Sequence, residues 1–269
     1  MNRIKKVSFI NHPILKNLVL DFTGPDGKAV DTVIIAGENG NCKSIILNLL
    51  YGVASGAIDC EADIVLENSS SDNILLSYRI QDTYIIVDDH DGLKCLPGYD
   101  AFIDKYHFSG IYSDVDITFN SKNIQTVTSL TLDSSSESRR SQSDMPRQIK
   151  QLLIDVQALD DAALSEAMRK NPDKTKRELN VEERMPRFTR AFSRMFSDLS
   201  YERIDNVNNH KEIIFSKNGI EIPIDDLSSG EKQVVYRGCF LLKDVNAING
   251  AFVFIDEPEI SLHPTWQKK

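Results

Sequence analysis

The sequence lacks the features of a membrane-spanning, secreted or disulfide-linked protein. No apolar run approaches the ~20 residues of a membrane-spanning helix. The basic N-terminus, residues 1–7, is not followed by the long apolar segment of a signal peptide. The four cysteines are scattered and form no CxxC pair, which favours reduced thiols. We therefore expect a cytoplasmic protein with no membrane contact.

Positive charge and metal-ligand clusters are also scarce. The net charge is −9 and the isoelectric point is about 5.1, which argues against a surface dominated by nucleic-acid binding but allows a local basic face. Five histidines are scattered, and no cluster of carboxylates accompanies them. A dedicated metal centre is therefore not expected. The 269 residues are enough for one large domain or two smaller ones.

What the sequence does contain is an apolar run leading into a short loop rich in glycine and asparagine. Residues 30–36 predict a buried strand, and Lys43-Ser44 open an apolar helical pattern to about Val53, with Gly52 and Gly56 at its end. This is the strand–loop–helix of a phosphate-binding P-loop, in which backbone N–H groups converge on phosphate oxygens. The predicted loop residues are Gly37, Glu38, Asn39, Gly40, Asn41 and Cys42.

The strict P-loop pattern has glycine immediately before the lysine, and this chain has Cys42 there. Cysteine places a Cβ and a sulfur where the backbone must approach phosphate closely. Because the side chain is small, we expect weakened rather than abolished nucleotide binding.

The rest of the chain predicts an α/β fold in three parts. Residues 1–112 form a P-loop lobe with an antiparallel flank, in which strands 3–10 and 17–22 precede a turn at Gly24–Gly27 and segments 74–80 and 83–88 form a hairpin. Residues 113–200 form a middle part, which the family resemblance given below implies is a variable insertion, with a polar loop at 133–144 and a helical pattern from Met145 to about Leu199. Residues 201–269 form the last part.

The insertion has a local excess of positive charge. Between Arg139 and Asp198 there are 13 Lys/Arg and 10 Asp/Glu residues. Phe188, Phe192, Met195 and Leu199 recur at helical spacing and predict a core-facing stripe, whereas Arg187, Arg190 and Arg194 lie on another side. Two interpretations remain open for that side: a solvated helical face, or a contact surface for nucleic acid or an acidic partner.

The last part carries two further motifs. A hairpin around Asn218-Gly219 precedes Leu227–Gln233 and a helix that runs to about Val245. Ser229 and Gly230 open this helix and offer an anion-binding N-terminus. Residues 251–255 then predict a central parallel strand that ends in Asp256-Glu257. Such an aspartate can hold Mg²⁺, and the glutamate can polarise the attacking water in nucleotide hydrolysis.

In this order the motifs resemble those of ABC-type ATPases, and residues 254–264 resemble the Walker B and D-loop stretch of the RecF-like and OLD-like (AAA_21-like) group related to SMC and Rad50 heads. The resemblance implies a P-loop NTPase fold with a mixed central sheet, an antiparallel β flank and a helical insertion. It also implies ATP and Mg²⁺ as ligands and a homodimer in which the signature motif acts in trans. Many members associate with DNA or serve in bacterial anti-phage defence.

The resemblance assigns a role to each matching residue. Lys43 contacts the β/γ-phosphates and is catalytic together with Glu257, the general base. Ser44 and Asp256 serve Mg²⁺, and Ser229 with Gly230 completes the site from the partner subunit. An effector, on another chain or in a C-terminal domain, is an expected partner, and DNA is a further candidate.

Some positions depart from the family pattern. Asn11-His12-Pro13 stand where the family has an arginine after its first strand, so the adenine contact is not assigned. Gln125 is a weak candidate for the Q-loop glutamine, and His263 is expected to form a turn or a dimer contact. The chain stops at Lys269, so we expect a truncated chain or the N-terminal part of a longer one.

Two rival functions stay open. A nucleotide-sensing scaffold that binds ATP with little turnover is favoured by Cys42 and opposed by the intact Asp256-Glu257. A transporter nucleotide-binding domain predicts a much shorter path than the 186 residues from Lys43 to Ser229.

Overall fold

A computed structural model describes most of the chain, namely residues 2–38, 40–79, 84–89, 92–97, 109–114, 124–128, 132–133, 138–141, 144–244 and 250–258. The chain divides into two compact units. Unit 1 comprises Met1–Tyr112, Ser136–Arg139 and Ala247–Asp256, and unit 2 comprises Ser113–Ser135, Arg140–Asn246 and Glu257–Lys269. The predicted division into three parts stays a prediction.

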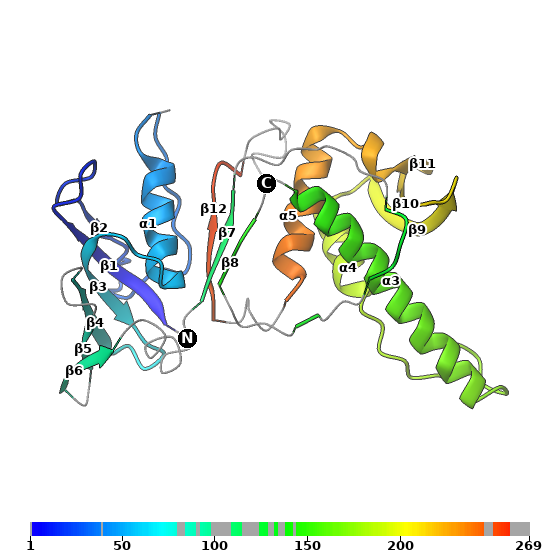
Figure 1. Cartoon of the computed structure of the whole chain (residues 1–269), viewed down its shortest axis with the longest axis horizontal. Coiled ribbons are helices and arrows are strands. Elements are labelled where there is room, and N and C mark those ends of the chain that lie inside the picture. The colour runs from blue at the N-terminus through cyan, green and yellow to red at the C-terminus, as the bar shows by residue number, and fades with distance from the viewer. Residues whose placement is uncertain are drawn as a thin grey trace. The chain divides into compact units, whose positions relative to one another are not determined.

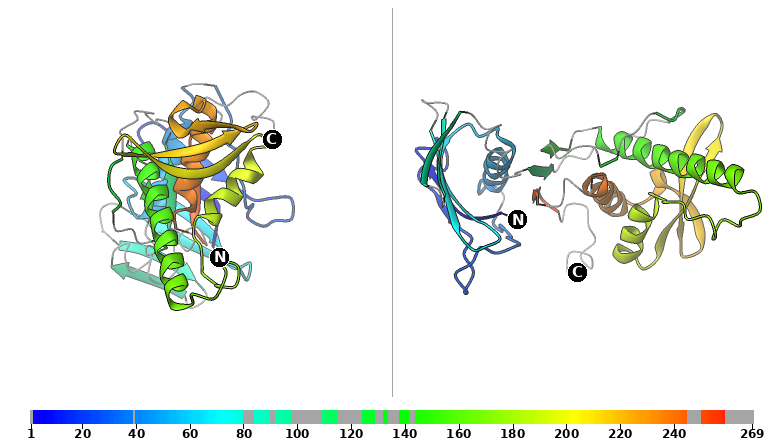
Figure 2. Two further views of the ribbon diagram at one scale, coloured as in Figure 1. Left: turned by 90° about the vertical axis from the view of Figure 1, so that its right-hand side faces the viewer. Right: turned by 90° about the horizontal axis from the view of Figure 1, so that it is seen from below.

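Unit 1 is built on an antiparallel sheet with one helix against it (Figures 1 and 2). The strand order is β2-β1-β3-β4-β5-β6, and each neighbouring pair is antiparallel. The helix is α1 (Lys43–Ser55). The strands are β1 (Arg3–Ile10), β2 (Val19–Asp21), β3 (Glu61–Glu67), β4 (Asn73–Tyr78), β5 (Tyr84–Asp89) and β6 (Gly92–Pro97).

The core of unit 1 follows from the alternation of its strands. Along β3, side chains at every second position are buried, and β4 buries Ile74 and Leu76 in the same way. In β1 the buried side chains are Ile4, Val7 and Phe9, because a bulge between Ile4 and Lys6 shifts the register. They pack with the apolar side of α1 into one cluster. Its members include Val7, Phe9, Ala62, Ile64, Leu66, Leu76, Ile46, Leu49, Leu50 and Val53.

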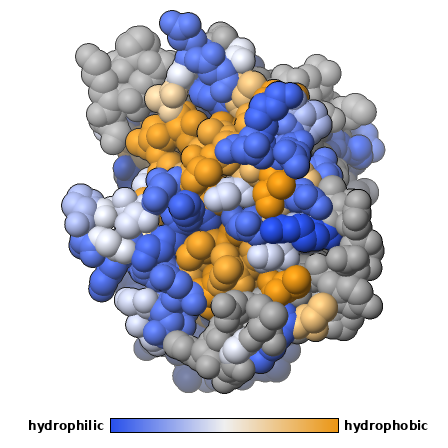
Figure 3. All heavy atoms as spheres, turned by 90° about the vertical axis from the view of Figure 1, so that its left-hand side faces the viewer, coloured by the Kyte–Doolittle hydropathy of each residue, from blue (hydrophilic) through white to orange (hydrophobic). Residues whose placement is uncertain are grey.

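The sheet also leaves large apolar side chains exposed. Val19 is 50% exposed, Leu75 40% and Ile86 37%. Figure 3 shows apolar side chains in two areas of this side of the molecule, with polar side chains between them. The solvent side of the sheet is therefore not uniformly polar, as is common for an antiparallel sheet surface.

Several predicted elements of unit 1 are confirmed. Strand 3–10 is β1, strand 17–22 is shortened to β2, and segments 74–80 and 83–88 pair as β4 and β5. The turn at Gly24–Gly27 closes through a bond from the Gly27 N–H to the Gly24 carbonyl. Gly56 ends α1 at φ 80°.

Gly52 does not end the helix but lies within it. A Cβ at this position would lie 3.1 Å from the Ala57 carbonyl oxygen. The glycine therefore allows the chain that leaves α1 to pass close to the helix.

The predicted buried strand at 30–36 is wrong for the structure described. Residues 32–38 have no regular secondary structure, and Ile34 is 88% exposed. A β-branched run favours extended geometry, but it becomes a strand only where a neighbouring strand pairs with it. In the described part of the chain this segment pairs with no strand.

A three-stranded sheet contains the predicted strand 251–255. Its order is β12-β7-β8, where β12 is Phe252–Ile255, β7 is Gly110–Ser113 and β8 is Arg139–Arg140. Within the described residues β12 is an outer strand of this sheet rather than a central one. The strand β8 also interrupts the predicted polar loop, whose residues 134–137 and 142–143 lie outside the described residues.

Unit 2 combines three helices with a small antiparallel sheet (Figure 1). The helices are α3 (Met145–Lys170), α4 (Pro186–Met195) and α5 (Ser229–Leu242). The strand order is β11-β10-β9, from β9 (Leu199–Val207), β10 (His210–Lys217) and β11 (Ile220–Pro223). A short 3₁₀ turn, η1 (Ile224–Asp226), leads into α5.

The hairpin prediction in unit 2 is confirmed in detail. Asn218 and Gly219 have φ values of 51° and 81° between β10 and β11. Positive φ at both central residues is the requirement of the tight turn that matches strand twist, and Asn-Gly meets it best.

The helical pattern from Met145 to Leu199 is broken in the structure. Residues 171–185 separate α3 from α4, and Leu199 begins β9. Phe188, Phe192 and Leu199 are buried as predicted, but Met195 is 48% exposed. Met195 is the last residue of α4, so the stripe leaves the core where the helix ends.

Candidate functional site

The predicted P-loop ends at the start of α1, and this helix start is open. Cys42 is the N-cap residue, and its side chain makes no capping hydrogen bond. No acidic residue lies in the first turn. The first N–H groups of a helix have no partner inside the helix and carry partial positive charge. The start of α1 is therefore suited to bind an anion such as a phosphate.

Cys42 has a backbone conformation that favours glycine. Its φ is 59° and its ψ is 19°, in the left-handed region. An L-residue pays a steric cost there that glycine does not. This explains why the strict motif has glycine at this position, and it adds backbone strain to the predicted crowding of phosphate.

The loop wraps around the Lys43 side chain. Its Nζ donates hydrogen bonds to the carbonyl oxygens of Gly37 at 2.8 Å and Glu38 at 3.0 Å. The Asn41 N–H closes the loop on the Glu38 carbonyl at 3.3 Å. The ammonium group therefore stays beside the helix start, where a phosphate would meet it. Gly40 has φ 89°, and Asn39 lies outside the described residues.

Unit 1 also brings α1 against the strand that ends in Asp256. The Tyr51 ring of α1 meets Phe254 of β12 edge-on, with centroids 6.3 Å apart, and meets Tyr112 of β7 at 5.4 Å. These contacts fix the P-loop helix and the ends of β7 and β12 in one packed core. Ser44 is half-buried in the first turn of α1.

Asp256 is a buried carboxylate at the end of β12. It is 3% exposed, and the Tyr112 hydroxyl donates to its Oδ2 at 3.1 Å. The sequence analysis did not identify Tyr112, because a tyrosine in an apolar strand has no motif that marks it.

The next residue, Glu257, is half-buried and has φ 41°. It precedes Pro258, and a residue before proline is already restricted in backbone conformation. The carboxylate that the resemblance assigns as general base therefore sits on a strained backbone.

The start of α5 is capped from within. Ser228 is the N-cap: its Oγ accepts from the Glu231 N–H at 3.4 Å, and its own N–H donates to the Glu231 carboxylate at 2.8 Å. Ser229 is exposed and Gly230 is buried in the first turn. Ser228 was not among the predicted residues, although the Ser-x-x-Glu spacing of a capping box marks it.

Lys217 completes this cap. Its Nζ lies 2.6 Å from the buried Glu231 carboxylate. Burial raises the pKa of Glu231, but the hydrogen bonds from Lys217 and Ser228 outweigh it and the pKa is lowered overall. The same hydrogen bond raises the pKa of Lys217. The negative charge at this helix start is thus held as an ion pair.

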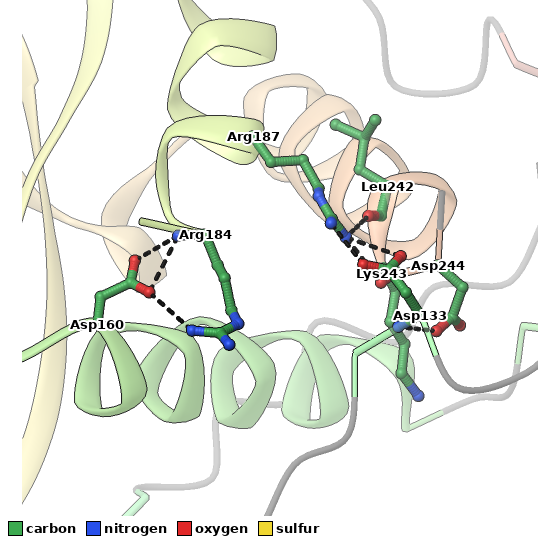
Figure 4. Close-up of polar contacts among 7 residues, drawn as sticks. All are labelled: Asp133, Asp160, Arg184, Arg187, Leu242, Lys243 and Asp244. Atoms are coloured by element: carbon green, nitrogen blue, oxygen red, sulfur yellow. Dashed lines mark hydrogen bonds and ion pairs between the residues drawn. The ribbon is translucent and has the colours of Figure 1, made fainter. Parts of the chain in front are cut away.

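The arginines of the predicted basic side of α4 differ in their surroundings, and Figure 4 shows Arg187. Arg187 points inward and donates to both carboxylate oxygens of Asp133, at 3.1 and 2.6 Å. It also donates to the carbonyls of Leu242 and Lys243 at the end of α5. Arg187 is therefore an internal clamp rather than part of a contact surface, whereas Arg190 and Arg194 are exposed.

A second clamp in Figure 4 fixes the start of α4. The buried Asp160 of α3 accepts from the backbone N–H groups of Arg184 and Met185 at 2.8 Å. A carboxylate at this end of a helix satisfies unpaired N–H groups and complements the helix dipole. The helices of unit 2 therefore form a connected frame around α5.

Two weaker predictions have different outcomes. Gln125 is exposed and lies in unit 2, and its role stays a prediction. The strand pattern before it, at 115–119, and His263 lie outside the described residues.

No helix within the described residues combines the length and the apolar character needed to cross a membrane. No group of three or more His, Cys, Asp or Glu side chains in the same ranges is arranged to hold a metal ion.

The class of protein is an AAA-type P-loop NTPase domain, as the family match shows. Residues 33–269 match the model of the AAA_21 family, described as "AAA domain, putative AbiEii toxin, Type IV TA system". The chain belongs to this family.

Among solved structures, the chain is similar to the Smc head domain from Pyrococcus furiosus, crystallised with an extended coiled coil and bound to the C-terminal domain of ScpA. The sequences are 16% identical, the match covers 100% of this chain and 85% of the other, and the TM-score is 0.50. This likeness concerns the fold. No curated protein matches the chain.

Proposed function

We propose that this chain binds ATP with Mg²⁺ at the start of α1 and hydrolyses it. The observation that carries the proposal is the open, acid-free start of α1 with Lys43 held beside it, packed in one core with the strand that ends in buried Asp256. Unpaired N–H groups and an ammonium group fit a triphosphate, and a carboxylate with a hydroxyl fits Mg²⁺.

In this mechanism each residue has one task. The α1 N–H groups and Lys43 bind and orient the phosphates, and Ser44 and Asp256 would hold Mg²⁺, which neutralises phosphate charge when it is bound. Glu257 accepts a proton from the water that attacks the γ-phosphate. Removing the Glu257 charge therefore affects hydrolysis more than binding, because it acts on water and not on the ground-state phosphates.

We further propose that the start of α5 completes this site in a second copy of the chain. Ser229 is exposed there, and the neighbouring Glu231 charge is balanced by Lys217. A phosphate can approach such a helix start without meeting an unpaired carboxylate. ATP-driven dimerisation would then gate an effector or a DNA transaction in the cytoplasm, with anti-phage defence as the setting.

The first test compares the wild type with Glu257→Gln. We expect the variant to bind ATP with unchanged affinity and to lose most of its hydrolysis rate, about 100-fold or more for loss of a general base. Steady-state ATPase rates and equilibrium ATP binding measure the two effects. A Glu257→Gln protein that hydrolyses ATP at the wild-type rate would show that the assignment is wrong.

The second test addresses the partner copy. Lys43→Ala and Ser229→Arg should each be inactive alone, but their mixture should recover about a quarter of the wild-type rate. Half of the dimers are then mixed, and each mixed dimer has one intact composite site. A mixture as inactive as its components contradicts a site shared between copies. If ATP does not raise the molecular mass of the protein in solution, ATP-driven dimerisation is contradicted.

A second function is favoured by one observation, the strained Cys42 next to Lys43. A nucleotide sensor that binds ATP with little turnover tolerates an imperfect phosphate loop. This function predicts that the wild type and Glu257→Gln hydrolyse ATP equally slowly, and that both form dimers of higher molecular mass when they bind ATP.

A further inference from the structure

A dense group of positive charges lies at the end of α3 in unit 2. Residues 169–177 carry five basic side chains and one acidic side chain, a net charge of +4 in a chain whose total is −9. All five basic residues are exposed. Figures 1 and 2 show the chain turning at the end of α3 and running back beside the helix. Residues 169–177 are called the basic tip below.

The helix itself accounts for only part of this charge. Arg169 and Lys170 lie in the last turn of α3, where cations complement the helix dipole. Lys174, Lys176 and Arg177 follow the end of the helix. Because the dipole effect falls off within the last turn, it gives no reason for these three cations.

Ion pairing within the chain uses little of the charge. Lys170 pairs with Glu166 at 2.6 Å, and Lys176 pairs with Glu183 at 2.9 Å. Such exposed pairs contribute little to stability. The other three basic residues of the tip form no ion pair with a described residue. A phosphate group of a partner can therefore bind the unpaired cations and compete for the paired ones.

The basic tip is a defined turn. Asn171 caps α3, because its N–H and its Nδ2 both donate to the Ala167 carbonyl at 3.1 Å. The N–H and the Oγ of Thr175 donate to the Glu178 carboxylate at 2.7 and 2.8 Å, and Leu179 is buried. The first acid after the tip is thus occupied inside the turn. Cations on an ordered backbone lose less entropy when they bind a partner.

The composition of the basic tip favours a nucleic-acid backbone over a protein surface. Apart from Pro172 it has no apolar side chain, whereas the buried core of a protein interface is enriched in apolar and aromatic side chains. It also has no aromatic side chain on which an unpaired base could stack. Exposed cations without such groups are suited to the phosphates of a duplex, which are contacted without base readout.

We propose that the basic tip binds duplex DNA through its phosphate backbone, without regard to sequence. The sequence left open whether the positive charge of this region contacts nucleic acid, and Arg187 of α4 is bonded internally, whereas the tip is exposed. The inference rests on the proposed function for the DNA transaction that it serves. The contact itself requires neither ATP nor Mg²⁺, because none of its residues belongs to the nucleotide site.

The test measures binding of a fluorescein-labelled DNA duplex by fluorescence anisotropy, without nucleotide or metal and over a series of salt concentrations. It compares the wild type with the double variant Lys174→Gln, Arg177→Gln, which leaves Thr175 and Glu178 in place. We expect the affinity at about 0.1 M salt to fall at least about tenfold. The slope of log K against log salt should become less steep by about 1.8, because each phosphate contact contributes about 0.9.

Two further variants serve as controls. Arg190→Gln, Arg194→Gln removes the same charge from the exposed side of α4 and should change the affinity by about twofold or less, because salt screens distant charges. Lys174→Arg, Arg177→Lys keeps the charge and should keep the wild-type affinity. A duplex of unrelated sequence should bind equally well. The rate of ATP hydrolysis without DNA should be the same in the tip variant and the wild type.

Each other result overturns a stated part of the proposal. A wild type that does not bind the duplex, or a tip variant that binds it equally tightly, overturns the contact. A larger loss in the α4 variant than in the tip variant places the contact on α4. Binding to polyglutamate but not to the duplex identifies an acidic protein as the partner, and tighter binding to the single strand overturns the choice of duplex. A wild type that binds the duplex but neither binds nor hydrolyses ATP contradicts the proposed function alone.

Discussion

Two helix starts in this chain are built in opposite ways. The start of α1 has a residue at positive φ, no capping bond and no acid in its first turn, whereas the start of α5 has a complete capping box and a buried ion pair. A capping box satisfies orphan N–H groups inside the protein, and an open start leaves them for a ligand. The α1 start is therefore less stable by itself and is suited to bind phosphate, whereas the α5 start is a rigid, preformed surface.

The largest effect should come from the open start. Lys43→Ala should weaken ATP binding by about 2 kcal/mol, roughly thirtyfold, because a charge-assisted contact is lost. Isothermal titration with ATP measures this change. Lys211→Ala is the control, because this lysine also bonds a neutral oxygen, that of Asn206, but lies in unit 2. Equal affinities for the two variants would place the ATP site elsewhere.

The capped start should respond in stability rather than in binding. Ser228→Ala removes the N-cap acceptor and a donor to the buried Glu231, and should lower the free energy of unfolding by about 1 kcal/mol. Urea denaturation measures it. Ser229→Ala, one residue later and exposed, should change stability much less. If both variants unfold at the same urea concentration, the capping box does not stabilise α5.

The ion pair in the α5 cap should make folding stability depend on pH in the acidic range. Because the folded pKa of Glu231 is lowered, its contribution is complete above the unfolded value of about 4.3. It is lost as the pH falls through the folded pKa. Between about pH 6 and pH 3, the melting temperature should fall less on acidification in Glu231→Gln than in the wild type. Parallel curves would mean that other carboxylates dominate the acid response.

The smallest effect should come from relaxing the open start. Cys42→Gly removes the steric cost of the positive φ, but glycine also increases the entropy of the unfolded chain. The free energy of unfolding should therefore rise by about 0.5 kcal/mol. ATP affinity should rise as well, because the Cβ and sulfur no longer crowd the phosphate. Melting temperature and ATP titration check the two parts. Unchanged ATP affinity would remove Cys42 as a determinant of binding.

Local patterns predicted well the elements that depend on nearby residues. The Asn218-Gly219 hairpin, strand β1, helix α1 and its end at Gly56 follow from turn chemistry, alternation and capping, which act within a few residues. The helix opened by Ser229 was found for the same reason, although it ends at Leu242 rather than near Val245.

Features that depend on distant partners could not be predicted. The run at 30–36 has the composition of a strand, but pairing decides whether it becomes one. Arg187 looks like a surface charge until Asp133 and the end of α5 meet it. Tyr112 reaches Asp256 only after the fold brings together residues that are 144 positions apart. The roles of the P-loop, signature and Asp256-Glu257 residues stay predictions.

The positive φ of Glu257 has a consequence for how such a chain evolves. A glycine at that position would relax the backbone and give a more stable protein that lacks the proposed general base. Selection for stability alone would therefore tend to discard this carboxylate. On the proposed role of Glu257, its strained backbone is a trade-off in which the fold gives up some stability to keep the proposed proton acceptor in place.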